Sequence, residues 1–191
     1  MVWMIFGILA TIVMMICGCS LTRAGYETAA YQVSSKDSRF EIREYPALDL
    51  VSTPMAKTSN SESGSFRRLF GYISGDNEDS QKIAMTTPVF MEEGEADAQM
   101  SFVIPKDVAE KGAPEGTTAS VKITKLTKGR YGVYRINGAR TDKKIGAAKV
   151  ALDQWLKSQD LEAAGAFIVA GYDPPFTPPM LQRNEVMVRL R

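Results

Sequence analysis

The apolar positions between residues 63 and 75 follow the period of an α-helix. The stripe consists of Phe66, Leu69, Phe70 and Ile73, at spacings of i, i+3, i+4 and i+7. Ser63 or Ser65 can cap the start of this helix, and Gly75 follows its last apolar residue. The pattern therefore predicts a short amphipathic helix whose remaining faces carry Arg67, Arg68 and Tyr72.

Alternating apolar and polar residues predict strands on both sides of this helix. The predicted strands cover residues 40–45, 48–51, 83–91, 100–104, 121–126, 131–136, 167–170 and 186–190. Pro88 interrupts the third of these, which indicates an edge strand or a bulge because proline cannot donate to a sheet ladder. The turn at Lys128-Gly129 predicts that the strands on either side of it form a hairpin.

A second amphipathic helix follows the first by a nearly constant offset. Thr141 can cap it, and its stripe is formed by Ile145, Ala148, Leu152 and Leu156. Three pairs of positions, Leu69 and Leu152, Met85 and Val169, and Phe102 and Val186, are separated by 83, 84 and 84 residues. The chain thus reads as two strand-helix-strand-strand halves of an α+β fold. The halves can join into one closed or nearly closed barrel with a helix outside each, or form a split α+β sandwich.

The N-terminal segment differs from the rest of the chain because residues 1–22 carry no charge and residues 2–16 are nearly all apolar. The segment ends in Ile16-Cys17-Gly18-Cys19-Ser20, which resembles the cleavage box of bacterial lipoproteins. That resemblance implies a signal peptide over residues 1–18, a lipid on Cys19, a tether over residues 19–29 and a domain over residues 30–191. It also implies a periplasm-facing anchor in the outer membrane of a bacterial envelope. The alternative is an uncleaved membrane anchor, since no Lys or Arg precedes the apolar run.

Composition narrows the chemistry that this chain can perform. The 191 residues carry 23 Lys and Arg against 22 Asp and Glu, and no basic stripe that would favour nucleic acid is present. There is no histidine, and the two cysteines, Cys17 and Cys19, lie in the N-terminal segment. These absences exclude Ser-His and Cys-His nucleophilic pairs and the usual zinc ligand sets. Chemistry based on carboxylates, lysine or tyrosine remains open.

Five short motifs over about residues 30–191 make the chain similar to the SOUL family of haem-binding proteins. They are FEIREY at residues 40–45, Phe66 with YISGDN at residues 72–77, KIAMTTPV at residues 82–89, GYDPP at residues 171–175 and RNEV at residues 183–186. The resemblance implies a distorted antiparallel β-barrel of two pseudo-symmetric halves with two flanking helices. It also implies haem or another tetrapyrrole as the ligand.

Carried over by position, the resemblance implies a shallow groove beside the first helix. Its walls would be Phe66, Leu69, Phe70 and Tyr72, with Tyr172 from the second half, while Arg67 or Arg68 would bind a propionate. Some family members use a histidine as the axial ligand, and this chain has no histidine. The haem iron would therefore be coordinated by Met85, a Tyr phenolate or water. Thr177 stands where some relatives carry a basic residue.

These features favour a non-catalytic, lipid-anchored envelope protein that binds haem, a porphyrin or another flat apolar molecule. A protein-interaction module without a small ligand is the first alternative. The second alternative is an enzyme that uses carboxylates and tyrosines. It ranks below the first because no nucleophile and base stand out as a pair in the sequence.

Overall fold

The computed structural model describes residues 25–55, 61–92, 98–174 and 176–191. Cys19, the signal peptide and residues 19–24 of the predicted tether lie outside these ranges. Among the described helices, none combines the length and apolar character needed to cross a membrane.

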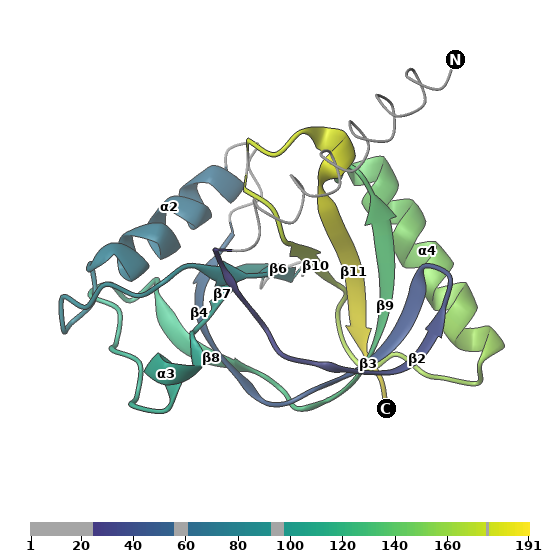
Figure 1. Cartoon of the computed structure of the whole chain (residues 1–191), viewed down its shortest axis with the longest axis horizontal. Coiled ribbons are helices and arrows are strands. Elements are labelled where there is room, and N and C mark those ends of the chain that lie inside the picture. The colour runs from purple at the N-terminus through teal and green to yellow at the C-terminus, as the bar shows by residue number, and fades with distance from the viewer. Residues whose placement is uncertain (1–24, 56–60, 93–97, 175) are drawn as a thin grey trace, which may run out of the picture.

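A nine-stranded antiparallel sheet forms the body of the described chain and curls into a half-barrel (Figure 1). Its order is β2-β3-β9-β11-β10-β6-β7-β4-β8. The strands are β2 (Gln32–Asp37), β3 (Phe40–Tyr45), β4 (Leu48–Pro54), β6 (Val89–Glu92), β7 (Gln99–Val103), β8 (Lys122–Leu126), β9 (Gly129–Asn137), β10 (Ile168–Gly171) and β11 (Arg183–Arg189). The short strands β1 (Glu27–Thr28) and β5 (Thr86–Thr87) pair in parallel beside it.

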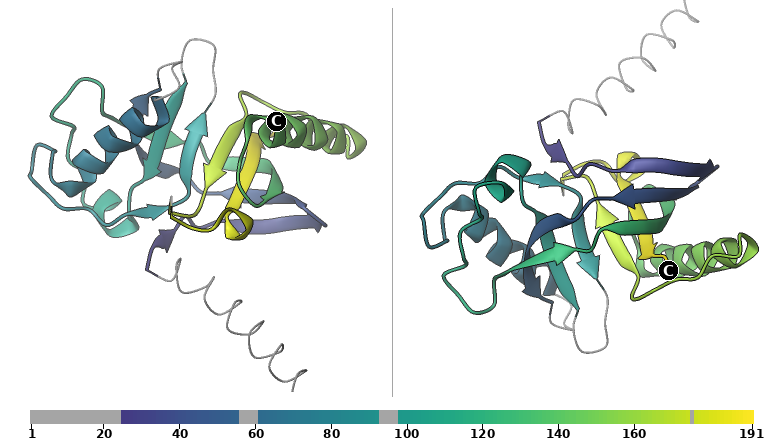
Figure 2. Two further views of the ribbon diagram at one scale, coloured as in Figure 1. Left: turned by 90° about the horizontal axis from the view of Figure 1, so that it is seen from above. Right: turned by 90° about the horizontal axis from the view of Figure 1, so that it is seen from below.

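Two long helices flank the sheet, α2 (Ser61–Ser74) and α4 (Asp142–Ser158), with the central strands between them (Figures 1 and 2). The short helices α3 (Lys106–Ala109) and η1 (Pro179–Leu181) lie in connections that the sequence pattern did not resolve. The hydroxyl of Thr141 accepts a hydrogen bond from the backbone N–H of Lys144, which confirms the predicted cap of α4. The prediction of an α+β fold with a barrel-like antiparallel sheet and two flanking helices is confirmed.

The buried face of α2 is rotated from the predicted one. The helix begins at Ser61, earlier than the predicted caps Ser63 and Ser65. Leu69 and Ile73 are buried as expected, but Tyr72 is buried too, and Phe70 is 51% exposed. A helix that packs on a curled sheet buries the side chains nearest the sheet axis, which here places Phe70 at the margin.

The two predicted halves are related by a pseudo-twofold arrangement about the central pair β6 and β10. Outward from β6 run β7, β4 and β8, and outward from β10 run β11, β9, β3 and β2. The first half therefore has four strands and the second has five, and each half has one long helix. The early strands β2 and β3 complete the second half, while β8 completes the first. The predicted hairpin of residues 121–136 is wrong, because β8 pairs with β4 while β9 pairs with β3 and β11.

The third predicted strand is also corrected. It is divided into β5 and β6 by Pro88, and β6 lies at the centre of the sheet rather than at an edge. Met85 precedes both strands, so the matched offset between Met85 and Val169 does not reflect equivalent strand positions. The observed register instead pairs Val169 with Met91 across the two halves.

Both faces of the central strands are buried, which explains why their sequences are almost continuously apolar. One face packs Val51, Phe102 and Val186 against the helices α2 and α4. The side chains of the other face, among them Tyr131 and Met187, pack against one another inside the half-barrel. Since successive strand residues point to opposite faces, neighbours in the sequence enter different cores.

Candidate functional site

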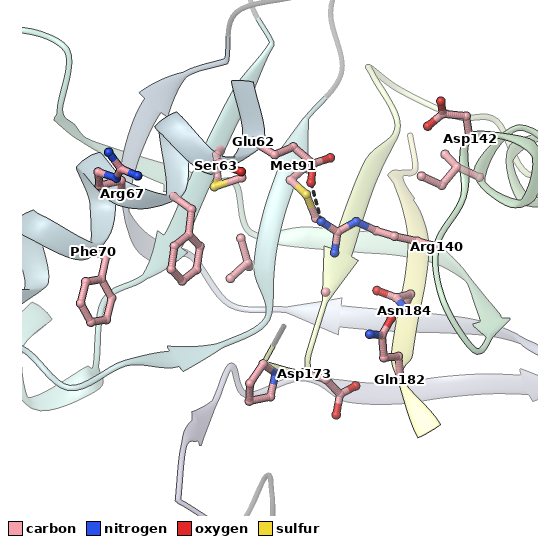
Figure 3. Close-up of a pocket in the computed structure, with 16 residues that line it drawn as sticks. Glu62, Ser63, Arg67, Phe70, Met91, Arg140, Asp142, Asp173, Gln182 and Asn184 are labelled. Atoms are coloured by element: carbon pink, nitrogen blue, oxygen red, sulfur yellow. Dashed lines mark hydrogen bonds and ion pairs between the residues drawn. The ribbon is translucent and has the colours of Figure 1, made fainter. Parts of the chain in front are cut away.

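A groove of about 700 Å³ lies between α2 and α4 over the central strands, at the meeting point of the two halves (Figure 3). Its floor includes Val89, Met91 and Met100 from the first half and Gly171 from the second. Val89 and Gly171 are paired across β6 and β10, so the floor crosses the pseudo-twofold axis. The groove is thus built from both halves.

The wall of the groove on α2 is aromatic. The rings of Phe66 and Phe70 are nearly parallel, with centroids 6.0 Å apart and an interplanar angle of 14°. Phe66 is fixed from behind by an edge contact with Phe102, at a centroid distance of 5.3 Å. Phe70 points into the groove from the same helix with half of its surface exposed (Figure 3). Parallel rings of this kind offer stacking surface to a flat apolar molecule.

Charged side chains of both signs border the groove. The guanidinium of Arg140, just before α4, donates to the carboxylate of Glu62 on α2 at 2.7 Å, and this ion pair joins the two sides (Figure 3). Arg67 forms no hydrogen bond or ion pair with any residue that the structure describes. Asp142 and Asp173 add negative charge, and Asp173 accepts a hydrogen bond from the backbone N–H of Arg183.

Gly171 keeps the middle of the floor open. A Cβ atom at this position would lie 3.3 Å from Nη1 of Arg140 and 3.7 Å from Cε of Met91. Any larger side chain would therefore project into the groove beside Arg140. The glycine of the GYDPP motif thus keeps this part of the groove unfilled.

Three of the eight ligand-binding residues predicted from the sequence line the groove, namely Phe66, Arg67 and Phe70. Leu69 is fully buried against the sheet. Arg68 turns back to the end of β4, where it donates to the hydroxyl of Thr53 at 2.9 Å and the carbonyl of Pro54 at 2.6 Å. These two residues lie outside the groove lining.

Tyr72, Met85 and Tyr172 also lie outside the lining. The hydroxyl of Tyr72 donates to the carbonyl of Pro114 at 2.7 Å, and burial, aided by the negative charge of Glu115, raises its pKa to about 12. Met85 is half-buried against the helix-side core. A neutral phenol already engaged in a hydrogen bond is not the phenolate that would bind haem iron.

Tyr172 belongs to a buried charge cluster inside the half-barrel, on the face of the sheet away from the groove. Its hydroxyl donates to Glu185 at 2.9 Å, and burial raises the pKa of Tyr172 well above its usual range. Glu185 also accepts hydrogen bonds from Arg43, at 2.6 and 3.0 Å, and from Arg183, at 2.9 and 2.8 Å. The barrel cluster therefore consists of Arg43, Tyr172, Arg183 and Glu185.

The charges of the barrel cluster are matched. Arg43 is 2% exposed, Glu185 is 0% exposed, and Glu41 provides Arg43 with a second carboxylate at 2.7 Å. Burial alone would raise the pKa of Glu185, but the hydrogen bonds and positive charges of Arg43 and Arg183 lower it. The guanidinium of Arg183 also stacks on the ring of Tyr172, 3.9 Å from its centroid. The FEIREY and RNEV motifs thus supply a structural cluster, a role that their sequence did not reveal.

Sequence reasoning missed Met91, Met100, Glu62 and Arg140 as lining residues. Val89 and Met91 are two apart in one strand and so share its groove face, which is a signal that the sequence carried. Arg140 lies in a connection, where no periodicity exists to indicate its direction. Within the described residues, no group of three or more His, Cys, Asp or Glu side chains is placed to bind a metal ion.

Comparison with solved structures shows the same fold in distant proteins. The C-terminal domain of EcmrR has 11% identity and a TM-score of 0.61, over 84% of this chain and 98% of that one. A hydrolase from Listeria innocua has 10% identity and a TM-score of 0.60, over 83% of this chain and 94% of that one. At this identity the likeness shows the fold alone.

Comparison of the sequence itself is more specific. No curated protein matches the chain. The model of the SOUL heme-binding protein family matches residues 26–189, which include both halves of the sheet and every element that lines the groove. The chain belongs to the SOUL heme-binding protein family.

Proposed function

We propose that this protein is a non-catalytic binding protein of the bacterial envelope, and that the groove between α2 and α4 holds haem or another flat apolar tetrapyrrole. The observation that carries the proposal is the aromatic wall of Phe66 and Phe70 over an apolar floor. A volume of about 700 Å³ suits a small-molecule ligand, since such sites span roughly 300–1,000 Å³.

The residues present fit the ring and the acid groups of a tetrapyrrole better than its iron. The ring system stacks on Phe66 and Phe70, and its carboxylates find guanidinium donors in Arg67 and Arg140. Among side chains of the types known to coordinate haem iron, the described lining offers the thioethers of Met91 and Met100. These residues would support binding without a histidine ligand.

Arg140 can bind a ligand carboxylate while it stays paired with Glu62, because a guanidinium has five N–H donors and Nη2 is the atom that donates to Glu62. Both partners of the pair are accessible to solvent, and exposed pairs of this kind contribute only about 0–1 kcal/mol. Breaking the pair would therefore cost little, and a charge-assisted hydrogen bond to a propionate would offset that loss.

The non-catalytic assignment rests on the family match, because the matching model describes heme-binding proteins. Within the described lining, Ser63 is the hydroxyl side chain, and an assay with Ser63→Ala would test whether it takes part in any turnover.

The location in the envelope rests on the N-terminal sequence. Cleavage after Gly18 and lipidation of Cys19 would leave the domain tethered by residues 19–29, facing the periplasm from the outer membrane. Mass spectrometry of the N-terminal peptide tests this part of the proposal. An unmodified peptide that retains Met1 would contradict it.

Titration with hemin and with protoporphyrin IX tests the binding function. We expect a saturable Soret shift at micromolar ligand, and we expect Phe66→Ala to weaken binding about tenfold through the loss of a stacked ring. Phe176→Ala is the matched control, because Phe176 is exposed and does not line the groove. No saturable shift with either ligand would refute the proposal.

A further inference from the structure

Exposed apolar side chains gather at the groove. The large hydrophobic residues exposed in the described chain include Phe70, which lines the groove and is 51% exposed, and Phe176 and Met180, which are 78% and 77% exposed. Phe176 and Met180 belong to the connection between β10 and β11, and Pro174 and Gln182 of this connection line the groove. We refer to Phe70, Phe176 and Met180 as the mouth residues.

Hydrogen bonds brace the described part of this connection. The backbone N–H of Thr177 donates to the carbonyl of Pro174 at 3.0 Å, and the side-chain amide of Gln182 donates to the carbonyl of Thr177 at 3.0 Å. Pro178 and Pro179 restrict its backbone further. In this arrangement Phe176 and Met180 face solvent.

The chain enters the domain at the same end of the groove. Thr28 pairs with Thr87, and the N–H of Ala29 donates to the carbonyl of Thr87 at 2.8 Å. Thr87 precedes the floor residue Val89 by two positions, and β1 lies beside the start of the β10–β11 connection (Figure 2). The first described strand, β1, therefore lies next to the groove. Cys19 lies at most about 25 Å of extended chain from Tyr26.

Basic side chains stand next to the mouth residues. A Cβ atom on Gly138 would lie 3.7 Å both from Nζ of Lys144 and from Cα of Met180, so these two residues are neighbours. Lys143 is exposed beside them, although Asp142 offsets part of the positive charge. An exposed apolar side chain next to a lysine, as at Met180, suits the interface of an anionic bilayer.

We propose that the mouth residues lie against the surface of an anionic lipid bilayer, so that the groove exchanges its apolar ligand directly with the lipid phase. The contact itself follows from exposed apolar residues, neighbouring lysines and the point of chain entry. The exchange rests in addition on the proposed function of the groove. A short N-terminal connection to the membrane would keep the mouth within reach of the bilayer.

Tryptophan fluorescence in vesicles tests the contact without any ligand. The full chain is reconstituted in phosphatidylcholine–phosphatidylglycerol vesicles as the variants Phe176→Trp, Met180→Trp and Val150→Trp. Val150 is the matched control, since it is an apolar residue of α4 with 57% exposure that does not line the groove. We expect the added emission at positions 176 and 180 to be blue-shifted and quenched by lipids brominated near the headgroup. Quenching at both positions no greater than at position 150 overturns the contact.

Hemin transfer from the same vesicles tests the exchange. We expect the double variant Phe176→Ser/Met180→Ser to take up hemin about tenfold more slowly than the wild type, because it loses apolar contact with the bilayer. The equilibrium partition of hemin should not change, since neither residue lines the groove. Uptake at the wild-type rate overturns direct exchange. If no variant binds hemin, the proposed function fails, and the quenching result still decides the contact.

Discussion

Replacing Glu185 by glutamine tests whether the barrel cluster stabilises the fold. Glu185 is fully buried and accepts two hydrogen bonds from Arg43, two from Arg183 and one from Tyr172. Glutamine keeps the volume of the side chain but removes the charge. Arg43 then stays buried with Glu41 as its remaining carboxylate.

The size of the effect follows from the burial. Breaking a buried ion pair by removing one partner costs about 3–5 kcal/mol, because the other charge is left without its partner. Domains of this size are stable by only about 5–15 kcal/mol. With a urea m-value of about 2 kcal/mol/M, the unfolding midpoint of Glu185→Gln should fall by roughly 2 M.

The effect should also depend on pH in a defined direction. The pKa of Glu185 in the folded protein is lowered from its usual value of 4.5 by Arg43 and Arg183. A lowered folded pKa contributes stability that is present above about pH 4.5 and is lost as pH falls through the folded pKa. The stability gap between wild type and Glu185→Gln should therefore be widest at neutral pH and should narrow in acid.

Urea unfolding of the chain from Gly25 onward, followed by circular dichroism at pH 7 and pH 3, measures both effects. Glu41→Gln is the matched control, because it removes a second carboxylate from Arg43 at a side chain that is 14% exposed. We expect this control to lose less stability than Glu185→Gln, because Glu41 is partly accessible to water and Arg43 keeps Glu185 as its partner. An equal loss in the two variants would refute the reasoning, because burial would then not determine the cost.

Three further predictions concern packing, the groove and alkaline pH. Gly132→Ala should destabilise the protein by about 1–3 kcal/mol in urea unfolding, because the new Cβ would lie 2.9 Å from a methyl carbon of Leu156 on α4; an unchanged midpoint would contradict it. Arg140→Gln should weaken protoporphyrin binding about tenfold and leave binding of carboxylate-free octaethylporphyrin unchanged; equal losses would show that Arg140 does not bind the acid group. Wild type should lose about 1 kcal/mol between pH 9 and pH 11 that Tyr72→Phe does not lose, because the folded pKa of Tyr72 is raised to about 12 and the unfolded chain deprotonates first. Matching alkaline profiles would count against this assignment.

The sequence predicted the elements of the fold better than their pairing. Period-two alternation located β3, β4, β7 and β11, and the stripe from Ile145 to Leu156 located α4, because these patterns arise from local geometry. The pairing of β8 and β9 was wrong because a two-residue turn indicates a hairpin only when both strands are otherwise free. Here β9 is already paired on both edges by β3 and β11.

The site was predictable on one wall only. Phe66, Arg67 and Phe70 lie on one helix, so helical spacing and family resemblance both indicated them. Tyr172 was predicted to line the groove from the family resemblance. It follows the groove residue Gly171 directly, and since successive residues of an extended chain point to opposite faces, its side chain enters the barrel cluster. Arg140 comes from the other half of the chain, and only the folded sheet brings it to Glu62.

The position of β3 in the sheet has a consequence for how the chain must fold. Phe40 of β3 pairs with Tyr134 of β9, so the second half includes a strand that precedes the whole first half in the sequence. Contacts between residues far apart in sequence slow folding, because the chain entropy is lost before the contact forms. The strands of the first half, by contrast, all lie within residues 48–126. The second half should therefore form late, and a chain that ends after β8 would leave β3 without β9 and β6 without β10.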